Sequence, residues 1–122
     1  MLLVKKSFDK YGYSLNEISW GNAPMGPTVY QTVWHFFVSF IEKDTNKKII
    51  FDLSLFMTEQ ESKHPRKVKK ELLTAMKGQD IIRCCEILIE KFPDASDYIL
   101  SKIPDHLCDK VNTNNAVSSA GL

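Results

Sequence analysis

Four residues of the chain have the chemistry of metal ligands: Cys84, Cys85, His106 and Cys108. Thiolates and imidazoles are the groups that zinc prefers in proteins. Neighbouring residues of a helix point roughly 100° apart, so Cys84 and Cys85 would face different directions. The spacing matches no standard zinc site, and we expect neither a metal ion nor a cofactor.

A cysteine paired with a histidine could instead act as a nucleophile. Such a thiol needs an electropositive, partly exposed site that lowers its pKa. Cys85 falls on the apolar stripe of a predicted helix, and Cys84 is flanked by apolar residues. Cys108 lies in an acidic stretch, which raises a thiol pKa. The sequence therefore predicts a protein without catalytic residues, and we expect that it is not an enzyme.

The remaining candidate base is His35, in the apolar run TVYQTVWHFFVSF. A general base needs an orienting partner within hydrogen-bonding reach. The predicted hairpin places Phe56 directly opposite His35, and the nearest carboxylate on that face, Asp52, lies two pair positions away. This arrangement favours a structural histidine that is stacked and hydrogen-bonded once.

Basic residues gather at the start of a predicted helix, in the segment KHPRKVKK. Free backbone N–H groups and lysine or arginine side chains at such a helix start can hold phosphate. The rest of the chain is not basic, since its net charge is only +1. Nucleic-acid binding is therefore the alternative function, through Lys63, Arg66, Lys67, Lys69 and Lys70.

Acidic residues outnumber basic ones in the last third of the chain, which contains seven acids and four bases after Gly78. These carboxylates could guide a basic partner, because charge complementarity sets the association rate and the specificity. One face of the predicted hairpin is also too apolar to leave in water as a continuous patch. The predicted partner-binding residues are Asp94, Asp97, Asp105, Asp109, His35, Phe37 and Phe56.

Two strand-forming runs flank a predicted turn at 44–47 and define a hairpin. If Lys43 faces Lys48, the pairs that follow place eight apolar side chains on one face, because strand side chains alternate. The four predicted pairs are Phe40 with Phe51, Val38 with Leu53, Phe36 with Leu55, and Trp34 with Met57. The other face carries Ile41 opposite Ile50, together with Phe37 and His35. We expect Phe36, Val38, Phe40, Leu53, Leu55 and Leu88 to be buried.

The periodicity changes to that of helices after Pro65, a favourable first residue of a helix. Val68, Leu72, Ala75 and Met76 form one stripe that ends before Gly78. The next segment, 79–92, has the broadest apolar face and ends at Pro93, so it should be the most buried helix. A short helix capped by Asp94 and a final turn after Pro104 complete the prediction.

The order of strands before helices favours an α+β fold, with an antiparallel sheet of about four strands in the N-terminal half packed on three to four C-terminal helices. Residues 2–8 are predicted to pair with 13–20, and 21–27 to form a loop because of their glycines and prolines. We expect one domain over 1–111 and a flexible polar tail over 112–122.

No apolar stretch approaches the roughly 20 residues that cross a bilayer, and the hydrophobic residues at the N-terminus precede its lysines, unlike a secretory signal. The three cysteines do not resemble a disulfide framework, which favours a cytoplasmic protein. Small α+β chains without catalytic motifs often act as stoichiometric inhibitors. We therefore expect a non-enzymatic, protein-binding inhibitor, most like a bacterial immunity protein that neutralises a toxin, with a basic toxin or nuclease as a possible partner.

Overall fold

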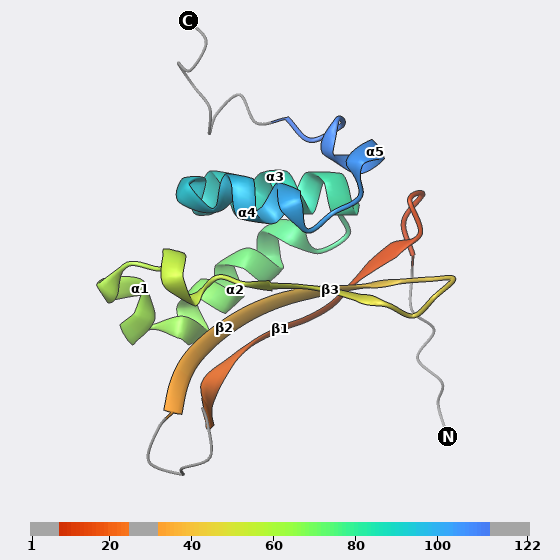
Figure 1. Cartoon of the computed structure of the whole chain (residues 1–122). Coiled ribbons are helices and arrows are strands. Elements are labelled where there is room, and N and C mark those ends of the chain that lie inside the picture. Colours follow the sequence, from red (N-terminus) through yellow and green to blue (C-terminus); the bar gives the residue numbers. More distant parts are fainter. Residues whose placement is uncertain (1–7, 25–31, 113–122) are drawn as a thin grey trace, which may run out of the picture.

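The structure is a computed structural model that describes residues 8–24 and 32–112. These residues form one antiparallel sheet and a layer of helices (Figure 1). The three strands are β1 (Tyr13–Pro24), β2 (Thr32–Glu42) and β3 (Lys48–Asp52), in the order β1-β2-β3. The helices are α1 (Glu59–Lys63), α2 (Pro65–Met76), α3 (Ile81–Lys91), α4 (Ser96–Ser101) and α5 (Asp105–Cys108), with short 3-10 turns η1 (Ser54–Phe56) and η2 (Pro93–Ala95). The predicted α+β class is confirmed.

The described sheet has three strands rather than about four. The additional strand was predicted over 2–8, which lies outside the described residues apart from Phe8, as does the predicted tail apart from Asn112. The predicted loop at 21–27 is wrong in its first part, because β1 continues to Pro24 and pairs Gly21 with His35. Proline is tolerated there because β1 is an edge strand of the described sheet and Pro24 is its last residue.

All the described helices lie on one side of the sheet (Figure 1). We call the opposite side the outer sheet face. On β2, Phe36, Val38 and Phe40 point to the helices and are almost fully buried, while His35 and Phe37 point to the outer sheet face. The alternation of β2 thus separates the core from the outer face, as its sequence predicts.

The register of the predicted hairpin is wrong by two residues, since Phe40 pairs with Ile49 and Val38 with Phe51. The turn begins one residue earlier than expected, because the Glu42 N–H donates to the carbonyl of Lys47 (2.9 Å) and so closes the turn over 43–46, where Asn46 adopts a left-handed conformation (φ 59°). Asparagine tolerates that conformation better than most residues. A two-residue shift keeps each side chain of the paired strands on its predicted face, so the buried face of β2 and β3 is the predicted one.

Leu55 was expected in the core but is 92% exposed. The carboxylate of Asp52 accepts hydrogen bonds from the Ser54 backbone N–H (3.1 Å) and from its hydroxyl (2.6 Å). These bonds end β3 and begin the turn η1, which carries Leu55 away from the sheet. The other predicted core residues, Phe36, Val38, Phe40, Leu53 and Leu88, are buried as expected.

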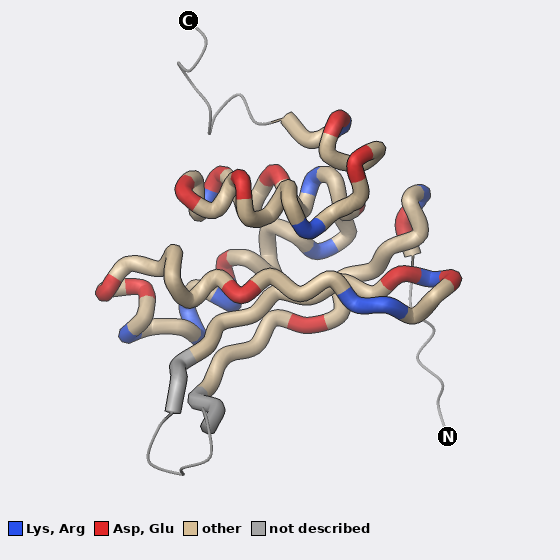
Figure 2. Tube along the Cα trace, in the orientation of Figure 1, with Lys and Arg blue, Asp and Glu red and all other residues tan. Residues whose placement is uncertain are grey.

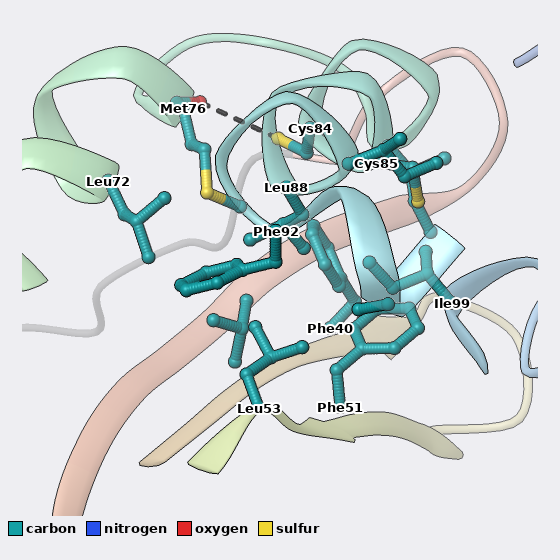
Figure 3. Packing of buried hydrophobic residues seen from close by; sticks show 14 of the residues in the cluster. Phe40, Phe51, Leu53, Leu72, Met76, Cys84, Cys85, Leu88, Phe92 and Ile99 are labelled. Carbon is teal, nitrogen blue, oxygen red and sulfur yellow. Dashed lines mark hydrogen bonds between the residues drawn. The ribbon is translucent and has the colours of Figure 1, made fainter. Parts of the chain in front are cut away.

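Helix α3 lies at the centre of the helical layer, as its broad apolar face predicts (Figures 1 and 3). Leu88 and Phe92 face Phe40 of β2 and Leu53, which follows β3 (Figure 3). Ile99 of α4 completes the cluster beside Phe51 (Figure 3). On α2, Val68, Leu72 and Met76 are buried, whereas Ala75 is exposed. The buried residues of α3 are Ile81, Ile82, Cys84, Cys85, Leu88 and Ile89.

Asp94 does not cap a helix as predicted. Pro93 begins the 3-10 turn η2, so α4 starts only after Ala95. The residue at the N-cap of α4 is therefore Ala95, and it makes no side-chain capping hydrogen bond. The predicted ends of the longer helices are correct, because Pro65 is the first residue of α2 and α3 ends just before Pro93.

Candidate functional site

The outer sheet face presents apolar side chains from two strands. The rings of His35 and Phe37 stack with centroids 5.1 Å apart and planes inclined by 12°. Ile41 lies further along β2, and Ile50 on β3 is 43% exposed. The outer faces of antiparallel sheets that meet water are normally polar, so this group stands out on the described surface.

His35 has a carboxylate partner that the predicted register did not place in reach. Its Nδ1 atom lies 2.9 Å from Oδ2 of Asp52. The two-residue shift pairs Asp52 with Phe37, which brings the carboxylate next to His35. The prediction of a stacked histidine with one hydrogen bond is correct, but its partners are Phe37 and Asp52 rather than Phe56.

Burial alone would raise the pKa of Asp52, but hydrogen bonds from Ser54 and His35 outweigh it and hold that pKa below its usual value. The charged carboxylate therefore orients the imidazole and leaves its Nε2 atom toward other partners. Such an orientation is also what a general base needs. Within residues 8–24 and 32–112, however, His35 makes no hydrogen bond to a hydroxyl or a thiol that could serve as its nucleophile.

Phe56 does not join His35 and Phe37. Its ring lies against Tyr98 of α4, with centroids 5.7 Å apart and planes inclined by 34°. The Tyr98 hydroxyl in turn accepts a hydrogen bond from the backbone N–H of Asp52 (3.0 Å). Phe56 thus packs against the helical layer, and the predicted set of three aromatic binding residues is divided between two places.

The predicted acidic residues Asp94, Asp97, Asp105 and Asp109 are all exposed. Asp94 lies in η2, Asp97 in α4 and Asp105 in α5, and Asp109 follows α5. All four belong to the helical layer (Figure 2). Because the helices separate them from the outer sheet face, one flat partner surface cannot contact both groups. The acids and the apolar outer face are therefore two distinct candidate surfaces.

The basic residues gather where α1 meets α2 (Figure 2). There they line an open depression of about 520 Å³, which we call the basic groove. Lys69 of the predicted set does not line the groove, but its ammonium group lies 5.4 Å from the centre of the Trp20 ring. The polar and aromatic residues that line the groove are Trp20, Lys63, His64, Arg66, Lys67 and Lys70.

Trp20 was not predicted as a site residue. A bulge at Asn16 shifts the alternation of β1, so Ile18 and Trp20 face the helices together with Tyr13. The Asn16 side chain donates to the hydroxyl of Ser39 (3.2 Å). A slip of one position in the spacing of apolar residues is the sequence signature of such a bulge.

The cysteines lie as their apolar surroundings predict. Burial raises the pKa of Cys84 and of Cys85 to about 12. Burial and the nearby Asp105 and Asp109 also raise the pKa of Cys108, whose thiol donates to the carbonyl of Leu100 (3.1 Å). The part of the chain that the structure describes brings no three metal-binding side chains together.

Comparison of the chain with protein-family models, curated proteins and solved structures finds no match. Among the described helices, none has the length and apolar character needed to cross a bilayer. Residues 8–24 and 32–112 present three candidate functional surfaces: the outer sheet face, the acidic helices and the basic groove.

Proposed function

We propose that this protein acts without catalysis, by binding a partner protein on its outer sheet face and blocking it in the manner of a bacterial immunity protein. The observation that carries this proposal is the group of apolar side chains on a face that no described helix covers. Phe37 is its centre, since the ring is half-buried and stacked on His35. Aromatic residues in such positions often supply most of the binding energy of an interface.

The polar residues of the outer sheet face give the proposed interface its specificity. His35 and Asp52 form a hydrogen-bonded pair with side chains that are 24% and 35% exposed. A partner that covers this pair must satisfy its remaining hydrogen-bonding capacity, because burying unpaired polar groups is costly. The proposed partner therefore presents apolar side chains with at least one polar group among them.

The exposed acids have a long-range role in this proposal. Asp94, Asp97, Asp105 and Asp109 lie away from the outer sheet face, so they would act on a basic partner during its approach rather than by contact. Charges of this kind change association rates, and salt screens them over about 8–10 Å at physiological ionic strength. They would favour a basic partner such as a nuclease toxin.

A photo-crosslinking residue introduced at Phe37 tests the proposal in the native cell. The matched control carries the same residue at Leu55, which is 92% exposed but lies in the turn η1. We expect a specific partner to be captured from position 37 and not from position 55. Identical captures from the two positions would contradict the choice of surface.

With the captured partner purified, the contributions of Phe37 and of the acidic residues to binding can be measured separately. Phe37→Ala should weaken binding by more than about 1 kcal/mol, as expected for an interface hot spot, and should relieve inhibition of the partner. Reversing Asp97 and Asp105 to Lys should mainly slow association, and added salt should produce the same effect. If neither change matters, this surface assignment is wrong.

A further inference from the structure

The basic groove combines an aromatic ring with several cations on the helical side of the sheet, away from the outer sheet face. Trp20 is half-buried and extends from β1, where it pairs with the buried Phe36. Lys69 lies over the Trp20 ring at 5.4 Å. One strand and one helix thus bring together an indole and a positive charge that are far apart in the sequence.

The cations of the groove are largely without acidic partners. In the described part of the chain, no carboxylate lies within ion-pair distance of Arg66, Lys67 or Lys70. Lys63 contacts Glu59 at 3.7 Å, and both side chains are mostly exposed. An exposed pair of this kind is weak, so the groove keeps several positive charges for an anionic ligand.

We propose that the basic groove binds single-stranded nucleic acid, with an unpaired base against Trp20 and the backbone phosphates on the surrounding cations. Proteins bind single strands by this combination of a positively charged groove and aromatic side chains on which bases stack. A duplex keeps its bases stacked on each other, so it would leave the indole unused. The depression of about 520 Å³ is also local, and the net charge of +1 gives no broad basic face for a duplex.

Fluorescence anisotropy with a labelled oligothymidine of about 12 nucleotides, within the usual site sizes of single-strand binding folds, tests this proposal. We expect Trp20→Leu to weaken binding about tenfold or more and Trp20→Phe to retain most of it, because phenylalanine still offers a ring for stacking. A Trp20→Leu variant that folds and binds as tightly as the original protein would overturn the proposal.

The cations are tested by a pair of variants with equal loss of charge. Arg66→Gln with Lys70→Gln removes two charges from the groove, whereas Lys10→Gln with Lys102→Gln removes two lysines that lie over tyrosine rings elsewhere. We expect only the first variant to flatten the plot of log K against log salt, by about 1.4, at about 0.7 per lost phosphate contact. Equal effects of the two variants would overturn the site.

Three unlabelled competitors distinguish a single strand from other polyanions. Unlabelled oligothymidine should displace the probe, while a duplex of the same length and polyglutamate should be at least tenfold weaker. Equal competition by polyglutamate would show a general polyanion surface and would overturn the proposal. Tighter binding of the duplex would overturn it as well.

A crosslinking experiment on the unmodified protein keeps the test independent of variant folding. An oligonucleotide that carries 5-iodouracil is irradiated in complex with the full chain, and the modified peptide is mapped by mass spectrometry. We expect the crosslink at Trp20. A crosslink confined to tyrosines outside the groove, such as Tyr11 or Tyr98, would overturn the proposal.

Discussion

The carboxylate of Asp9 accepts a hydrogen bond of 2.7 Å from the backbone N–H of Ile81, which lies 72 residues further along the chain. The other oxygen of the same carboxylate accepts from the backbone N–H groups of Tyr11 (2.8 Å) and Tyr13 (3.0 Å). Asp9 therefore joins the turn before β1 to the first residue of α3. Its hydrogen bonds connect the edge strand β1 to α3, the central helix of the core.

Removing this carboxylate should destabilise the whole domain. Asp9→Ala leaves three N–H donors without their acceptor, and we expect a loss of about 1–3 kcal/mol in the free energy of unfolding measured in urea. The stability of Asp9→Asn should lie between those of the original protein and Asp9→Ala, since the asparagine amide has a single acceptor oxygen. Asp94→Ala is the control, because Asp94 is exposed and should change stability by less than about 0.5 kcal/mol.

Core truncations should separate the buried leucines from the exposed one. Leu53→Ala or Leu88→Ala should cost about 2–5 kcal/mol, since both side chains are fully buried and the change leaves a cavity. Leu55→Ala makes the same chemical change at a residue that is 92% exposed and should be nearly neutral. A loss below about 1 kcal/mol for both buried leucines in urea unfolding would contradict the packing of α3 on the sheet.

The lowered pKa of Asp52 predicts a specific dependence of stability on pH. The charged carboxylate stabilises the fold above the ordinary pKa of 3.8, and this contribution is lost as the pH falls through the lower pKa of the folded state. At pH 7, Asp52→Asn should destabilise the protein by about 1 kcal/mol. The gap between the two proteins should close below about pH 4; a gap that is unchanged at low pH would refute this assignment.

Thiol labelling should follow burial rather than position in the sequence. Cys84 and Cys85, with pKa values of about 12, should not react with a maleimide in the native state near neutral pH. Cys108 should react first, and slowly, because its pKa is also raised. Mass spectrometry after limited labelling reads out the order, and rapid modification of Cys85 would show that α3 is less protected than its packing indicates.

Some features could be read from the sequence and were missed. The pattern Thr58-x-x-Glu61 is a capping box, and both of its hydrogen bonds form at the start of α1. The slip in alternation before Ile18 indicates the bulge that turns Trp20 toward the helices. These are local signals, so a closer reading of the chain would have found both.

The sequence by itself determined the α+β class, the two faces of β2, the apolar stripes of α2 and α3, and the burial of Cys84 and Cys85. These features depend on periodicity, which is written into neighbouring residues. Only the tertiary structure decided the pairing of His35 with Asp52, the place of Trp20 beside Lys69, and the bond from Ile81 to Asp9. Each of these contacts joins segments whose relative position depends on strand register and helix packing, because a small shift in either changes which distant side chains meet.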